Sequence, residues 1–287
     1  MIRRAALCVL MAACMPAMTP AWAQSAAPPS RVVTLAPHIT EMVFAAGAGH
    51  ALVGTVVSSN YPPDARNLPK IGDGAASVNA EALIRLKPDL VLAWQHTGAV
   101  AALAPLLQSM GIPLALVAPD RIADIPDQIE KLGSRLGTPQ HASRKADTLR
   151  TTLHALENQY ANRPALRVFI EIGHTPLYAV GHDTMLNDAL RICGGVNIFD
   201  NSRLAALPLG PEHVLQKHPQ VILIAGTTPL QEQRAKDRWA KLGLTPAAGT
   251  HLYGINPDAL FRPGPRLIEA TTEICRVLEH TRTQPEE

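Results

Sequence analysis

The stretch from Thr138 to Asn162 most constrains the fold, because it predicts a single helix about as long as a small domain is wide. Thr138 is expected to cap the first turn of a helix, Pro139 stands where a missing N–H costs nothing, and Pro164 stops the helix just past its end. At 1.5 Å per residue the helix would be roughly 35 Å long. Its apolar residues recur at steps of three and four and form one narrow stripe: Ala142, Ala146, Leu149, Leu153, Leu156 and Tyr160.

Strands and helices alternate on both sides of this stretch. Before it we predict strands at about 31–35, 51–57, 90–93 and 114–117, and helices at 39–46, 80–86, 100–109 and 122–136. After it we predict strands at 168–172, 221–224 and 252–255, helices at 185–193, 211–217, 231–242 and 266–280, and irregular segments at 201–209 and 256–265. This pattern favours an α/β protein in which two Rossmann-like lobes, 24–137 and 163–287, are joined by a helix at 138–162. An ordinary surface helix on one large domain is the alternative.

Residues 1–23 have the organisation of a secretory signal peptide. Arg3 and Arg4 precede an apolar run, and a small-residue cleavage site ends at Ala23. We therefore expect the protein to be exported across the inner membrane and cut after Ala23. Cys14 lies in a context similar to a lipoprotein site, but cleavage there would leave an unusually short apolar region, so we rank it below Ala23.

The charge balance and the motifs exclude several functional classes. Removal of Arg3 and Arg4 leaves 24 basic and 24 acidic residues, which does not favour nucleic acid as a partner. No later apolar run has the length of a membrane span, so we expect a soluble chain. The sequence contains no G-x-S-x-G elbow, P-loop, H-E-x-x-H or C-x-x-C motif and no dinucleotide fingerprint. We therefore expect a monomeric binding protein without a cofactor, not an enzyme.

Two cysteines, Cys193 and Cys275, remain after the signal peptide is removed. In an exported chain, two cysteines are expected to pair. Closing a loop of about 82 residues would stabilise the fold by roughly 4 to 5 kcal/mol on the chain-entropy account. Two buried free thiols are the alternative.

The two halves share a sequence pattern that indicates duplication. Glu81 and Glu212 each lie seven residues before a proline, and each proline is followed by a buried strand. Both acids fall in the first turn of a predicted helix, where the helix dipole favours a carboxylate whatever the function. Related lobes could instead present the two acids on one face to a partner with two equivalent subunits.

The chain resembles the cobalamin-binding members of the helical-backbone metal-complex receptors, which serve bacterial ABC importers in the periplasm. The resemblance covers nearly all of the expected mature chain. It implies a ligand cleft between two lobes and contacts from Glu81 and Glu212 to a permease dimer in the inner membrane. The segments that carry it are Arg31 to Pro37 with Thr40-Glu41, Tyr61-Pro62-Pro63, Leu86 to Trp94, Cys193 to Phe199, and Pro265-Arg266 ahead of Cys275.

The same resemblance implies four ligand-binding residues: Tyr61, Trp94, Asp258 and Arg262. Their chemistry suits a corrinoid, because aromatic rings cover a flat apolar macrocycle while an acceptor and a fork of donors match its peripheral amides. Two further pocket tryptophans of the family correspond here to Ala75 and Ala206. Losing two stacking surfaces would cost on the order of a few kcal/mol of affinity.

Haem or a ferric siderophore is therefore the alternative ligand. Haem iron takes His or Tyr ligands, and four such residues fall in predicted loops that could face the cleft: His38, His96, His174 and Tyr178. A zinc or manganese site would need a compact set of His and carboxylate ligands, which the sequence does not provide in one place. We therefore predict no metal site built from protein ligands alone.

Overall fold

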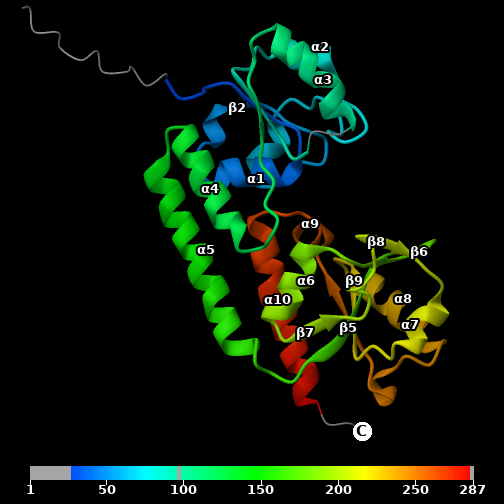
Figure 1. Ribbon diagram of the computed structural model, residues 1–287. Coiled ribbons are helices and arrows are strands. Elements are labelled where there is room, and N and C mark those ends of the chain that lie inside the picture. The colour runs from blue at the N-terminus through cyan, green and yellow to red at the C-terminus, as the bar shows by residue number, and fades with distance from the viewer. Residues whose placement is uncertain (1–26, 96–97, 285–287) are drawn as a thin grey trace, which may run out of the picture.

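Two β-sheets, connected by one long helix, form the framework of the molecule (Figure 1). The computed structural model describes residues 27–95 and 98–284. The N-terminal sheet has the strand order β2-β1-β3-β4, and all its pairings are parallel. Its strands are β1 Val32–Thr34, β2 Leu52–Gly54, β3 Leu90–Ala93 and β4 Leu114–Leu116. Because helices cover both faces of a parallel sheet, β1 and β3 are buried along their whole length.

Four helices belong to this N-terminal half. They are α1 Pro37–Ala45, α2 Ala80–Arg85, α3 Gly98–Ser109 and α4 Asp124–Arg135, and short 3-10 turns lie at Gly49–Ala51 and Pro63–Asn67. Proline occupies the first turn of α1, and the Asn79 side chain caps α2 by accepting from the Ala82 N–H. The predicted helices are thus all present, with ends shifted by a few residues.

The C-terminal sheet is mixed. Its order is β10-β9-β5-β6-β8, and β7 also pairs with β5. Strands β7, β9 and β10 continue the parallel part, whereas β6 and β8 are antiparallel. The strands are β5 Leu166–His174, β6 Leu177–Val180, β7 Gly195–Asn197, β8 Ala206–Pro208, β9 Val221–Ala225 and β10 His251–Ile255. The helices are α6 Thr184–Ile192, α7 Pro211–Gln216, α8 Pro229–Ala240, α9 Pro257–Leu260 and α10 Pro265–Thr283, with a 3-10 turn at Pro246–Ala248.

Three strands and one helix of this half were not predicted. Strand β8 lies within 201–209 and helix α9 within 256–265, both of which we expected to be irregular. Strands β6 and β7 were also missed. Each is only three or four residues long, too short to show a clear period. Pro208 ends β8, which lies at the edge of the sheet, where a missing N–H is tolerated.

The predicted long helix is present as α5, Pro139–Tyr160, which runs alongside α4 and past α10 (Figure 1). The expected stripe is buried except for Tyr160, which is half-buried. Our expectation for Thr138 was wrong: its hydroxyl does not cap α5 but donates to the carbonyl of Ala46, 2.7 Å away. That bond ties the start of α5 to the end of α1. Among the described helices, none has both the length and the hydropathy needed to cross a membrane.

The predicted disulfide joins Cys193 and Cys275, whose Cα atoms are 4.5 Å apart. Cys193 ends α6 and Cys275 lies within α10, and both residues are fully buried. The disulfide therefore fixes α10 against α6. From Cys275, the first part of α10 extends toward the N-terminal half of the molecule.

Candidate functional site

Loops from both halves of the molecule meet around a cavity of 360 Å³. In the N-terminal half these loops follow β1, β2 and β3 at their carboxyl ends, where open α/β sheets bind ligands. In the C-terminal half the wall comes from the segment between α9 and α10. The lining residues are Leu35, Ala36, Pro37, His38, Ser58, Asp73, Gly74, Ala75, Trp94, Gln95, Val100, Phe261, Arg262 and Pro263.

A second cavity of 140 Å³ adjoins the first at Trp94, Phe261 and Pro263. Its other walls come from α6 and α10 in the C-terminal half, so we call the two cavities together the cleft. Trp94 directly follows β3 and is 41% exposed although it is a large apolar side chain. An exposed ring between two cavities offers a stacking surface to a ligand that enters between the halves.

Tyr61, the second predicted aromatic contact, lies in the loop after β2. The anchor of this loop is a buried hydroxyl cluster in which Ser59 Oγ lies 2.7 Å from Thr55 Oγ1 and 3.0 Å from Thr40 Oγ1. The guanidinium of Arg266 lies over the Tyr61 ring, 4.4 Å from its centroid. Tyr61 thus has one face on a cation from α10 while the side chain remains exposed.

A network of charged side chains connects the halves beside the cleft. Glu41 on α1, 1% exposed, accepts from Arg266 Nε at 2.9 Å and Nη2 at 2.6 Å. Arg262 Nη1 donates to Glu41 at 3.3 Å and to Asn60 Oδ1 at 2.8 Å. Arg262 Nη2 also donates to Asp258 Oδ1, and Asn60 Nδ2 donates to Asp258 Oδ2 at 2.7 Å. Burial alone would lower the pKa of Arg266, but the hydrogen bond and charge of Glu41 hold it above its usual value.

Two of the predicted ligand residues, Asp258 and Arg262, belong to this network. Asp258 and Arg262 do lie together, and Arg262 lines the cleft, but both are already bonded to protein groups. No role for Glu41, Asn60 or Arg266 was predicted from the sequence. A signal was available for two of them, because Thr40-Glu41 and Pro265-Arg266 are among the segments that carry the resemblance.

His38, a predicted haem ligand candidate, lies in the wall of the cleft and is almost completely buried. Its ring meets the Trp94 ring edge to face, with centroids 5.1 Å apart and an interplanar angle of 83°. Burial, and secondarily the positive charge of Arg262, lower the pKa of His38 to about 3. The imidazole is therefore neutral at physiological pH.

Neither Tyr61 nor Asp258 is among the residues that line the two cavities, and most of the other predicted residues lie away from them. Ala75 lines the cleft, on a loop that Asp73 holds by accepting three backbone N–H groups, whereas Ala206 lies exposed on β8. His174 and Tyr178 are exposed at the β5–β6 turn and do not line the cleft. His96 lies outside the described residues. Within 27–95 and 98–284, no group of three or more His, Cys, Asp or Glu side chains is placed to hold a metal ion.

Glu81 and Glu212 occupy equivalent positions in the two halves. They lie in the first turns of α2 and α7, with side chains 81% and 62% exposed. The duplication extends to the backbone, because Lys87 and His218, which directly precede the two prolines of the shared pattern, both have φ of 46°. Positive φ is uncommon outside glycine, so this shared conformation supports the internal repeat. Helices α2 and α7 lie on the side of the molecule opposite α5 (Figure 1).

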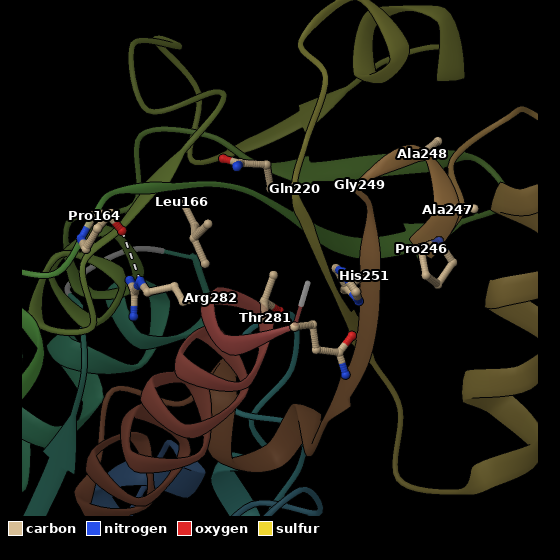
Figure 2. Close-up of a pocket in the computed structure, with 11 residues that line it drawn as sticks. Pro164, Leu166, Gln220, Pro246, Ala247, Ala248, Gly249, His251, Thr281 and Arg282 are labelled. Carbon is tan, nitrogen blue, oxygen red and sulfur yellow. Dashed lines mark hydrogen bonds between the residues drawn. The ribbon is translucent and has the colours of Figure 1, made fainter. Parts of the chain in front are cut away.

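A larger cavity of 590 Å³ lies at the other end of α10 (Figure 2). Helix α10 has 19 residues, so this cavity is roughly 28 Å from the cleft. Arg282, its prominent cation, donates to the carbonyls of Pro164, Cys193 and Gly194 at 2.8–2.9 Å and is thus committed to the fold. No Trp, Tyr or Phe is among the described residues that line it. The cleft is therefore the better candidate site.

Comparisons with known proteins support the fold. The vitamin B12-binding protein of Vibrio vulnificus (strain YJ016) is 33% identical over 250 residues, 87% of this chain and 90% of that protein. The crystal structure of the periplasmic vitamin B12 binding protein BtuF of Vibrio cholerae superposes with a TM-score of 0.79 at 30% identity, covering 90% of this chain and 99% of that one. The predicted class, two α/β lobes joined by one long helix, is thereby confirmed.

A haem-binding protein has a similar structure. The periplasmic heme-binding protein RhuT from Roseiflexus sp. RS-1, in its apo form, gives a TM-score of 0.73 at 28% identity and covers 88% of this chain and 98% of that one. Residues 32–251 match the family described as periplasmic binding protein. This match spans most of the 287 residues. The chain therefore belongs to the periplasmic binding protein family.

Proposed function

We propose that this protein captures cobalamin in the cleft and delivers it to an ABC importer in the inner membrane. The observation that carries the proposal is the exposed Trp94 ring, which stands between two cavities at the junction of the two halves. A cavity of 360 Å³ is at the low end of the volumes that enclose drug-sized molecules. The cleft therefore encloses one edge of a bulky ligand and leaves the rest of the ligand outside.

Arg262 in the cleft wall and Asp258, which is bonded to it beside the cleft, offer polar groups that suit the amide-rich rim of a corrinoid. Each carboxylate oxygen of Asp258 accepts one protein hydrogen bond and keeps a lone pair for an amide N–H. Arg262, held at the cleft wall by Glu41 and Asn60, presents a positioned donor group to amide carbonyls. We therefore assign Tyr61, Trp94, Asp258 and Arg262 to ligand binding, with Tyr61 held by Arg266.

Haem is the second candidate ligand, because the cleft wall contains His38 and a haem-binding relative has a similar structure. Haem carries two propionates, which would favour Arg262 but would be repelled by Asp258. Cobalamin fits the observed pair of an acceptor and a donor better than haem does.

Delivery requires a surface for the permease. We propose that Glu81 and Glu212 form it, since both are exposed, lie in equivalent first turns and belong to helices on one side of the molecule. We further propose cleavage of residues 1–23 on export, lobes at 24–137 and 163–287 joined by the helix at 138–162, and a monomer in the periplasm that performs no catalysis.

Substitution of Trp94 tests the ligand-binding assignment. Trp94→Ala removes a ring whose burial against the ligand is worth on the order of 1.5–3 kcal/mol, so cyanocobalamin affinity should fall roughly 10- to 100-fold in calorimetric titration. Asp258→Ala should also weaken cyanocobalamin binding. If haem were the ligand, the same substitution would leave hemin affinity unchanged or raise it. Leu230→Ala, at an exposed position on α8, is the matched control and should bind as wild type. Unchanged affinity in Trp94→Ala contradicts the assignment.

A further inference from the structure

One buried polar atom stands out across the described part of the chain. His38 Nε2 is the only buried side-chain nitrogen or oxygen there that has no hydrogen-bond partner. Buried polar groups are nearly always paired, because leaving one unpaired in the interior is costly. An unpaired atom in the wall of a cleft indicates that its partner is brought by something that enters the cleft.

The surroundings of His38 leave one direction open for such a partner. His38 lies in the first turn of α1, and behind it the N-cap of α10 is so close that a Cβ at Gly264 would be 3.2 Å from the His38 Cβ. The His38 ring also makes an edge-to-face contact with Trp94, and both residues line the cavity. The side chain of Trp94 is itself substantially exposed, so its ring is free to shift.

We propose that His38 is a further ligand-contacting residue, whose Nε2 hydrogen-bonds to a peripheral carboxamide of the corrinoid after the ligand displaces the Trp94 ring. This inference rests on the proposed function. A neutral imidazole carries one N–H and one lone pair. A carboxamide complements either tautomer, because it donates from its nitrogen and accepts at its oxygen.

The electrostatics of the site support a neutral partner. Burial and the nearby Arg262 keep the imidazole uncharged, so the contact does not require a proton from solvent. The charged groups around the cavity are Arg262 and Asp73, and Asp73 is occupied by the backbone N–H groups of its own loop. A carboxamide binds such an uncharged ring without bringing a new charge into the cleft.

A purely structural role for His38 makes different predictions. If the ring serves only to pack against Trp94, its replacement lowers the stability of the free protein. If Nε2 instead pairs only with the ligand, an apolar replacement removes an unpaired polar atom from the free protein. The stability of the free protein is then unchanged or higher, while its affinity for the ligand falls.

The experiment compares His38→Leu, which removes both ring nitrogens, with His38→Gln, whose side-chain amide reaches about as far as Nε2. His154→Leu, on the exposed face of α5, is the control. Cyanocobalamin is titrated by calorimetry at pH 7.5, and Tm is measured without ligand. We expect His38→Leu to bind about ten-fold more weakly, the factor associated with one hydrogen bond, with an unchanged or higher Tm. His38→Gln should bind within about three-fold of wild type.

Three results would overturn the inference. The first is wild-type affinity in His38→Leu, and the second is a His38→Gln protein as weak as His38→Leu. The third is a His38→Leu protein that loses Tm along with affinity, which would assign His38 to packing. Failure of wild type to bind cyanocobalamin would overturn the proposed function itself, and is thus distinguishable from these three.

Discussion

Glu41→Gln is expected to lower the free energy of unfolding by about 3–5 kcal/mol, because it leaves the buried Arg266 guanidinium without its carboxylate and leaves Arg262 with the Asp258 carboxylate alone. Glu41 is 1% exposed, and the side chains of Arg262 and Arg266 are 11% and 10% exposed. Glutamine keeps the shape but supplies one neutral acceptor in place of two charged ones. The decrease in the free energy of unfolding therefore measures the contribution of the Glu41 charge and not that of its side-chain volume.

Denaturant unfolding followed by circular dichroism measures this loss. Glu81→Gln is the matched control, since its carboxylate is 81% exposed and paired with Arg85 on the same helix. Exposed pairs of this kind contribute about 0–1 kcal/mol, so the control should unfold close to wild type. If Glu41→Gln were as stable as the control, the network between the halves would contribute little to the fold.

Reversal of both proposed docking charges, Glu81→Lys with Glu212→Lys, is expected to abolish cobalamin uptake by cells that depend on this protein. Ligand affinity should stay at the wild-type value, because neither residue lines the cleft. A permease surface that binds two carboxylates is expected to be cationic, so two lysines in their place would repel it by several kcal/mol, which is enough to prevent docking. Each single reversal should give an intermediate rate if the two halves contact equivalent subunits.

The control for this experiment carries the same change in net charge at another place. Asp147→Lys with Glu157→Lys reverses two exposed acids on α5, on the opposite side of the molecule from α2 and α7 (Figure 1). Uptake by this control should match wild type. Normal uptake by the Glu81 and Glu212 double variant would contradict the docking role. The two acids would then serve only to stabilise the first turns of their helices.

Long-range periodicity explains why most of the fold was predictable. Helix α5 has 22 residues with an apolar stripe along most of its length, and the buried strands β3 and β9 are continuous apolar runs, each preceded by a proline and a polar residue. The antiparallel strands β6 and β8 lack such a signal. They are three or four residues long and partly exposed, so their strand conformation depends on pairing with β5 and with each other.

The candidate site was predictable only in part, because its polar contacts join distant parts of the chain. Trp94 follows a strand, so its place at a sheet edge could be inferred from the sequence. The bonds of Glu41 to Arg262 and Arg266 cross more than 220 residues, and local patterns carry no information about such pairs. The unpaired Nε2 of His38 is likewise visible only in three dimensions.

Parallel titrations of the purified wild-type protein with cyanocobalamin and with hemin test the central claim most directly. Calorimetry and absorbance should show saturable binding of one cyanocobalamin per protein and no shift of the hemin Soret band. Saturable binding of hemin alone would contradict the claim. A Soret shift that disappears on replacement of His38, His96, His174 or Tyr178 would then identify haem as the ligand.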